Sequence, residues 1–226
     1  MQNCKTCIIR SKAVNTLSPK ELLFLMESCA ETTYQPRESI IKEGMLSSHI
    51  AYLKSGLAMV SKKGVKGIDQ ILKIVQPGNY IGLQTILFEK INQFSVTALE
   101  KCVVCFIDNV SFKELISRNN QFANELLAFL CREELTYFDR FVNIHQKQID
   151  GRLADILLFF SEEIYGGALS FTIPLSRGDM SALVCSTRES ITRALKDLSD
   201  INAIRVSGKK IEILDLERLK KISQNG

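Results

Sequence analysis

The sequence predicts an α+β protein: a strand-rich N-terminal part, a long helix, and a C-terminal helix-turn-helix with a β-hairpin. Three observations support this fold class. Short β-branched runs alternate with turn signals up to about residue 108, a heptad pattern of apolar residues follows, and two short helices are indicated within residues 173–198. At 226 residues the chain can hold two domains, since a domain commonly has roughly 100 to 150 residues.

The N-terminal part is expected to hold one helix and then short strands. Ser18 followed by Pro19 and Glu21 is typical of a helix start, with a cap, a proline at the first position and an acidic first turn. Apolar runs rich in β-branched residues then recur at residues 39–41, 49–53, 70–75 and 102–107. Because glycine- and proline-containing turns separate these runs, they predict an all-β sandwich or barrel.

A long helix is predicted after residue 111. Its apolar residues follow a 3,4 heptad rhythm interrupted at residue 134, and they are Leu127, Leu130, Tyr137, Phe141 and Ile144. A heptad pattern of ~18 residues is what two parallel helices need to pack together, which makes this helix a candidate dimer interface. The alternative is that the same stripe packs on its own domain. A second helix is expected over residues 153–160, ending at Gly166 and Gly167, where glycine can close a helix.

Residues 173–198 predict two short helices joined by a tight turn. Their common core is expected to consist of Ala182, Leu183, Ile191, Leu195 and Leu198. The second helix, capped by Ser186 or Thr187, would then expose polar residues that include two arginines, as a helix that meets base edges in the DNA major groove does. Residues 174–210 hold seven cations and four anions, which favours contact with a phosphate backbone.

These motifs resemble the CRP/FNR superfamily of transcription factors. The resemblance rests on Ser-Arg-Gly-Asp at 176–179, Thr-Arg-Glu-Ser-Ile-Thr-Arg at 187–193, a closing wing at 208–213, Pro-Gly-Asn-Tyr-Ile-Gly at 77–82 and Asp-Gly-Arg-Leu-Ala at 150–154. It covers nearly the whole chain from about residue 15. It implies a jelly-roll-like sensor β-roll at residues 1–118, a dimerisation helix at 119–149 and a winged helix-turn-helix domain at 150–226, with a hinge near Gly151.

The resemblance also implies a function. We expect a sequence-specific transcription regulator that binds an inverted repeat in double-stranded DNA as a homodimer. The resemblance places Arg188, Glu189 and Arg193 on the family's three base-contacting positions. Their chemistry fits this role, since arginine can donate bidentately to guanine and glutamate can accept from cytosine N4. Phosphate contacts or supporting roles are expected from Ser176, Arg177, Ser186, Thr187, Ser190, Thr192 and Lys209.

Two departures from the family pattern affect mechanism. Cys185 stands where many members have glycine in the turn between the helices, and a left-handed conformation there would cost on the order of 1 kcal/mol. Cyclic-nucleotide-binding members carry Gly-Glu and then Arg-Ser, whereas this chain reads Gly-Leu-Gln at 82–84 and Asn-Gln-Phe-Ser at 92–95. Cyclic AMP binding in the usual manner is therefore not expected, since a buried phosphate would lack a cation. The effector is expected to be an unknown small molecule or a redox signal.

No cofactor or metal is expected, with an iron-sulfur cluster as the alternative. Cys4 and Cys7 form a C-x-x-C pair, and Cys105 falls at the position of the family's distant ligand. Cys29 or Cys102 would have to complete the set. Since Cys102 and Cys105 are three residues apart on a strand, they should point to opposite faces and not chelate together. His49 and His145 are single and far apart, and they form no metal motif.

Composition excludes several other classes. The N-terminus has no apolar signal region, and no stretch approaches the ~18 apolar residues of a membrane helix, so a cytoplasmic protein without a membrane partner is expected. Seven scattered cysteines fit a reduced compartment. No phosphate loop, nucleophile elbow or H-x-x-x-H motif is found, which argues against an enzyme. The other class considered is a ligand-binding module whose C-terminal helices contact protein, and the paired arginines and wing lysines argue against it.

Overall fold

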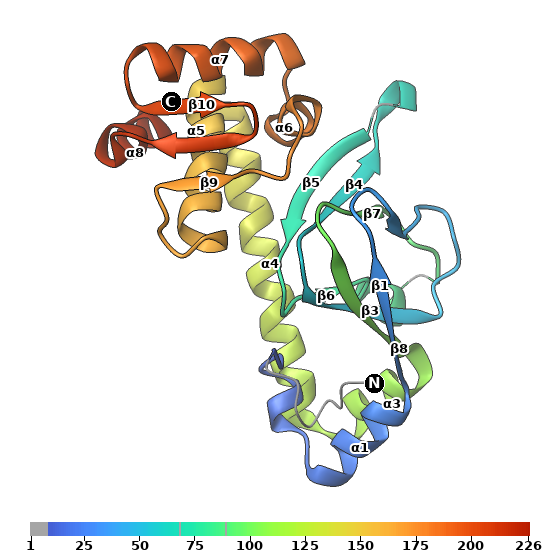
Figure 1. Cartoon of the computed structure of the whole chain (residues 1–226). Coiled ribbons are helices and arrows are strands. Elements are labelled where there is room, and N and C mark those ends of the chain that lie inside the picture. Colours follow the sequence, from blue (N-terminus) through green and yellow to red (C-terminus); the bar gives the residue numbers. More distant parts are fainter. Residues whose placement is uncertain (1–8, 68, 89) are drawn as a thin grey trace. The chain divides into compact units, whose positions relative to one another are not determined.

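The computed structural model describes residues 9–67, 69–88 and 90–226 (Figure 1). The chain forms two compact units that divide within the long helix α4 (Asn120–Gln146), between Glu134 and Leu135, and residues 69–71 group with the second unit. Among the described residues, no helix is both long enough and apolar enough to cross a bilayer. The expected domain boundaries at 118/119 and 149/150 stay predictions.

The first unit combines short helices with two sheets. Its helices, besides the first part of α4, are α1 (Pro19–Glu27), α2 (Gln84–Leu87) and α3 (Asn109–Arg118). Its strands are β1 (Cys29–Tyr34), β2 (Ser39–Ile41), β3 (His49–Ser55), β4 (Ala58–Lys63), β5 (Asp69–Val75), β6 (Tyr80–Ile81), β7 (Ser95–Ala98) and β8 (Cys102–Asp108). They form two four-stranded sheets in the orders β1-β8-β3-β6 and β2-β7-β4-β5, which confirms the predicted strand-rich N-terminal part.

Two hydrophobic cores lie on opposite faces of the β1-β8-β3-β6 sheet. Because side chains alternate along a strand, β3 sends Ile50 and Tyr52 to one core and Ala51 and Leu53 to the other. The first core is closed by residues of α1, α3 and α4, and the second includes residues of both sheets. Within the first core, the ring of Phe112 packs edge-on against Phe122 with centroids 5.2 Å apart.

Capping residues fix the helices around the first core. Ser18 is the predicted cap of α1 and forms a capping box with Glu21, and the hydrogen bonds from Ser18 lower the pKa of Glu21. Asn119 accepts a hydrogen bond from the amide of Phe122 at the start of α4, and its amide group donates to Glu21. Asp108 caps α3 by accepting from the amide of Ser111 at 2.9 Å. Asn119 thus joins the start of α1 to the start of α4.

The second unit contains the last part of α4, from Leu135, and a winged helix-turn-helix. Its elements are α5 (Ile149–Phe159), a π-helical turn (Phe160–Ile164), β9 (Ser170–Thr172), α6 (Arg177–Val184), α7 (Arg188–Asp200), β10 (Ile204–Ser207), β11 (Lys210–Ile213) and α8 (Leu216–Asn225). The three strands form one sheet in the order β10-β11-β9. The predicted glycine stop is confirmed, since Gly166 and Gly167 have φ of 60° and 89° just after the π-helical turn.

The break between α4 and α5 lies earlier than expected. Helix α4 ends at Gln146 and the extended Gln148 is the N-cap of α5, so the break lies a few residues before Gly151, and the hinge stays a prediction. Gly151 lies in the first turn of α5 and is buried. A Cβ atom there would come within 2.6 Å of the Cα of Gly226, so close packing, and not bending, accounts for this glycine.

Candidate nucleic-acid interface

Helix α6 begins at a capping box made by Ser176 and Asp179. The amide of Asp179 donates to the Ser176 hydroxyl at 3.1 Å, and the amide of Ser176 donates to the Asp179 carboxylate at 2.7 Å. The helix buries Met180, Leu183 and Val184. The Ser176 side chain thus has a structural partner at the position where phosphate contact was predicted.

The turn after α6 has the strained geometry expected at Cys185. This residue is the C-cap of α6 with φ 57° and ψ 55°, in the left-handed region that favours glycine. Its backbone amide and that of Ser186 both donate to the carbonyl of Ser181. The turn therefore keeps the helix-turn-helix shape although it lacks glycine.

Helix α7 presents the predicted recognition residues to solvent. Thr187, and not Ser186, is its N-cap, since the Thr187 hydroxyl accepts from the amide of Ser190 at 3.2 Å. One face of the helix is buried by Ile191, Ala194, Leu195 and Leu198. This spacing of three and four residues is that of a helix with one apolar face, and it fixes which side chains point outward.

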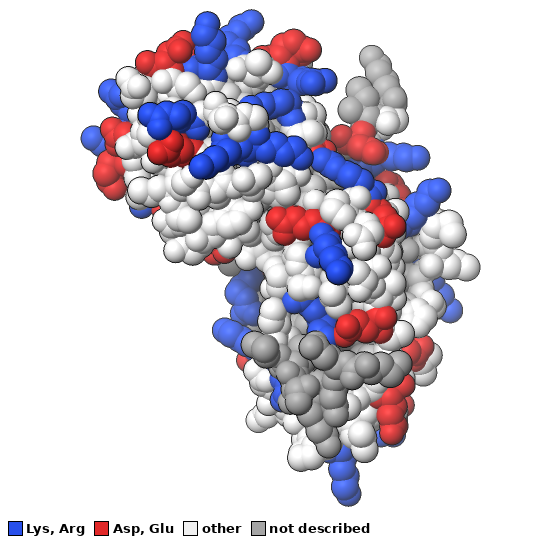
Figure 2. All heavy atoms as spheres, viewed as in Figure 1, with Lys and Arg blue, Asp and Glu red and all other residues white. Residues whose placement is uncertain are grey.

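The three candidate base-contacting side chains are exposed on the opposite face. These are Arg188, Glu189 and Arg193, and Figure 2 shows Lys and Arg side chains gathered over the region of α7. Hydrogen bonding to its own amide and to Thr187 in the first turn of α7 lowers the pKa of Glu189. The hydroxyl of Thr192 donates to the carbonyl of Arg188, within its own helix.

Arg177 connects α6 to the wing. Its guanidinium donates to the carbonyl of Gly208 at 3.2 Å, and burial lowers its pKa. Gly208, with φ 62°, opens the two-residue turn between β10 and β11, and Lys209 is exposed beside it. Arg177 therefore has a contact that supports the wing, while Lys209 is accessible to a phosphate.

Residues 82–84 and 92–95, where cyclic-nucleotide-binding members of the family carry Gly-Glu and Arg-Ser, have a different chemistry here. Leu83 is buried in the first core, beside Tyr80 and Ile86, where a ribose-binding glutamate would stand. Gln84 is exposed, and Asn92 is buried with its backbone amide bonded to the carbonyl of Met45. Phe94, which stands before Ser95 where the pattern has arginine, packs against the second core. The described residues of this segment thus place apolar side chains where a carboxylate and a guanidinium were required.

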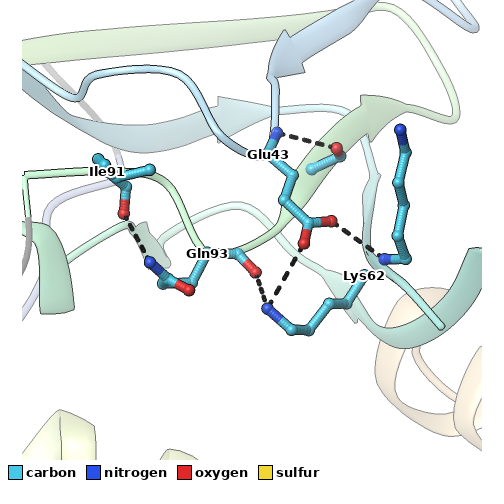
Figure 3. A network of polar contacts seen from close by, with 6 residues as sticks. Glu43, Lys62, Ile91 and Gln93 are labelled. Carbon is cyan, nitrogen blue, oxygen red and sulfur yellow. Dashed lines mark hydrogen bonds and ion pairs between the residues drawn. The ribbon is translucent and has the colours of Figure 1, made fainter. Parts of the chain in front are cut away.

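A cation near residues 92–95 is paired with an acidic residue (Figure 3). Lys62 contacts the carbonyl of Gln93, and its Nζ lies 3.5 Å from a carboxylate oxygen of Glu43. The other oxygen of Glu43 accepts from the amide of Lys63 at 3.0 Å, which lowers the pKa of Glu43. The amide of Glu43 in turn donates to the hydroxyl of Ser95. The charge of Lys62 is therefore balanced within the protein.

The cysteines of β8 point to opposite faces, as predicted. Cys102 lies in the second core and donates to the carbonyl of Leu57 at 3.2 Å, and burial raises its pKa to about 11. Cys105 lies in the first core, against which Cys29 also packs. No three His, Cys, Asp or Glu side chains within residues 9–67, 69–88 and 90–226 are grouped to hold a metal ion. Cys4 and Cys7 lie outside the described residues, so the cluster stays a prediction.

The stripe of α4 is partly exposed. Leu127, Tyr137 and Phe141 are 56%, 41% and 65% exposed, whereas Leu130 packs on the first core and Ile144 is half-buried. The helix also exposes three apolar residues that the heptad pattern did not include, namely Leu135, Phe138 and Val142. One predicted member of the stripe thus packs on its own unit and others face solvent, and the dimer interface stays a prediction.

Sequence reasoning missed two arginines that contact the end of α6. Arg140 in α4 donates to the carbonyl of Leu183, and Arg152 in α5 donates to the carbonyl of Val184, both at 2.6 Å. These contacts join residues more than 30 positions apart. No local pattern in the sequence could have indicated them.

Comparisons with known proteins define the class of this protein. Residues 31–119 match the cyclic nucleotide-binding domain family, and residues 151–222 match the Crp-like helix-turn-helix domain family. A domain of the first kind followed by one of the second defines a DNA-binding transcriptional regulator.

Relatives along the whole chain specify the family. The chain is 27% identical over 198 residues to the cAMP-activated global transcriptional regulator CRP of Escherichia coli, covering 85% of this chain and 93% of that protein. It is 22% identical over 215 residues to a CRP-like cAMP-activated global transcriptional regulator of Mycobacterium tuberculosis, covering 94% and 96%. The solved structure of FixK2 from Bradyrhizobium japonicum has a similar fold, with a TM-score of 0.77 at 22% identity, covering 86% and 96%. The chain belongs to the CRP/FNR superfamily.

Proposed function

We propose that this protein regulates transcription by binding an inverted repeat in double-stranded DNA as a cytoplasmic homodimer, without enzymatic activity. The observation that carries this proposal is the exposed face of α7. Arg188, Glu189 and Arg193 stand on it, close to the N-terminus of a helix whose other face is buried. Guanidinium groups in this position can read guanine edges, while the exposed Lys209 of the wing can neutralise a phosphate.

The proposed dimer uses the exposed stripe of α4. Leu127, Tyr137 and Phe141 are large apolar residues at heptad spacing, and burial against the same helix of a second copy would remove them from water. A two-fold pair of this kind would set two α7 helices about 34 Å apart, which corresponds to half-sites one helical turn apart. The palindrome of the DNA site would then reflect the symmetry of the protein.

The proposed effector is not cyclic AMP bound in the usual manner. The relatives from E. coli and M. tuberculosis are cAMP-activated by name. In this chain Leu83 is buried at the carboxylate position, and Lys62 near residues 92–95 is paired with Glu43. A buried cyclic phosphate would lack a compensating cation, which disfavours binding. The effector is instead an unknown small molecule or a redox signal, and no resident cofactor is required.

The test of the proposal is a binding selection from randomised duplex DNA. It is performed with full-length protein purified without oxygen, then repeated after exposure to air and with added cyclic AMP. Enrichment of a palindrome, unchanged by cyclic AMP, is the expected result. A difference between the two oxygen conditions would support the cluster or a thiol signal. Enrichment of no sequence under any condition would overturn the proposal.

A further inference from the structure

The last carbonyls of α6 receive hydrogen bonds from outside the helix. A helix end leaves carbonyl groups without amide partners, and a cation there is favoured by the helix dipole. Arg140 meets the carbonyl of Leu183, and Arg152 meets that of Val184, each at 2.6 Å. The two arginines come from α4 and α5 and converge on consecutive residues just before the turn.

Neither guanidinium is arranged for contact with DNA phosphates. Arg152 has its Nε buried without a hydrogen-bond partner, so the group is held inside the unit. Burial lowers the pKa of Arg140, while nearby Cys185 acts in the opposite direction. The guanidinium of Arg140 donates to the carbonyl of Leu183, just before the turn, and to that of Ile71.

The turn that these arginines contact sets the start of α7. Cys185 adopts φ 57°, and α7 begins at Arg188 after Thr187. A cysteine is less stable than glycine in this conformation, so other contacts must hold the turn. Reading base edges requires a fixed helix direction, whereas phosphate contact tolerates small shifts, because only base contacts carry sequence information.

We propose that Arg140 and Arg152 are positioning residues for sequence-specific DNA binding, which act by holding the strained, glycine-free turn at Cys185. The inference rests on the proposed function of α7. It assigns to α4 and α5 a direct part in setting the direction of the recognition helix, and it makes the need for the two arginines depend on the residue at position 185.

The experiment compares Arg140→Ala and Arg152→Ala with Arg118→Ala, a control on the exposed end of α3. Affinity is measured for the selected site and for random duplex across a range of salt. Each test variant should bind its site at least about tenfold more weakly, which equals the loss of one bidentate base contact. Binding to random DNA, which also reports folding, should stay within about twofold with an unchanged salt slope, because no phosphate contact is removed.

Rescue by glycine separates positioning from other roles. In a Cys185→Gly background the turn needs no external support, so each alanine substitution should then cost less than about threefold in site affinity. An equal loss in both backgrounds would overturn the inference, as would a salt slope reduced by about one per arginine, the sign of a phosphate contact.

If wild-type protein enriches no site, the proposed function fails first. If it enriches a site that the variants bind equally well, this inference alone fails.

Discussion

The two units differ in what they keep at the positions that relatives use for binding. In the second unit the residues of the proposed recognition helix are charged, exposed and supported by a buried apolar face, as Arg188 and Arg193 show. In the first unit the positions of the cyclic-nucleotide-binding pattern are apolar. Leu83 is part of the first core, and Phe94 packs against the second.

Under the proposed function, this difference means that one fold keeps its DNA-binding chemistry while the chemistry of its ligand-binding positions changes. The sheets and turns of the first unit need only apolar alternation and a few glycines, and these are present whether or not a ligand is bound there. Specific DNA binding needs particular hydrogen-bond donors at fixed positions of a helix, so a sequence can indicate this function. The predictions below separate the two units by measurement, from the largest expected effect to the smallest.

The largest effect is expected from opening the first core. Phe112 is fully buried against Phe122 and Tyr80, and Phe112→Ala should lower the free energy of unfolding of the first unit by about 3 to 5 kcal/mol. Hydrogen exchange should show faster exchange in β8 and α3, with protection of α7 unchanged. Val110→Ala, on the exposed side of the same helix, is the control and should change stability by less than about 0.5 kcal/mol. Equal loss of hydrogen-exchange protection in α7 would contradict the prediction, because it would show that the two units unfold together.

A smaller effect is expected on DNA binding from Arg193→Ala. Removal of a bidentate guanine contact should cost about 1 to 3 kcal/mol on the selected site and little on random duplex, as measured by fluorescence anisotropy. Lys209→Ala is the matched comparison in the wing. It should weaken both duplexes alike and reduce the salt slope by about one. Similar losses on both duplexes for Arg193→Ala would contradict its role in reading bases.

Much of the fold and of the interface could be predicted because the signals are local. The helix start at Ser18, the apolar face of α7 and the opposite faces of Cys102 and Cys105 each follow from spacing within one element. The left-handed turn at Cys185 was implied by the resemblance, since many members of the family have glycine at this position. Local chemistry was sufficient at these positions.

The remaining features depend on contacts between distant residues. Arg140 and Arg152 gained their partners only when α4 and α5 packed near the end of α6. The resemblance placed a hinge near Gly151, but it gave no sign of the close approach of Gly226 to this glycine. A glycine or an arginine in a sequence does not reveal which of its several physical roles is used, since tertiary packing decides that.

The smallest effect concerns a charged cap in the first unit. Asp108 accepts from Ser111 at the start of α3, and these hydrogen bonds lower its pKa. Because the folded pKa lies below the unfolded value of about 3.9, the ionised cap stabilises the fold above that pH, and the effect is lost as the pH falls through the folded pKa. Asp108→Ala should cost about 1 kcal/mol at pH 7 and less at pH 3, as measured by denaturant unfolding. Asp108→Asn keeps a good cap without the charge, so its stability relative to Asp108→Ala should not depend on pH. A loss of stability in Asp108→Ala that is the same at both pH values would show that the carboxylate charge has no part in capping α3.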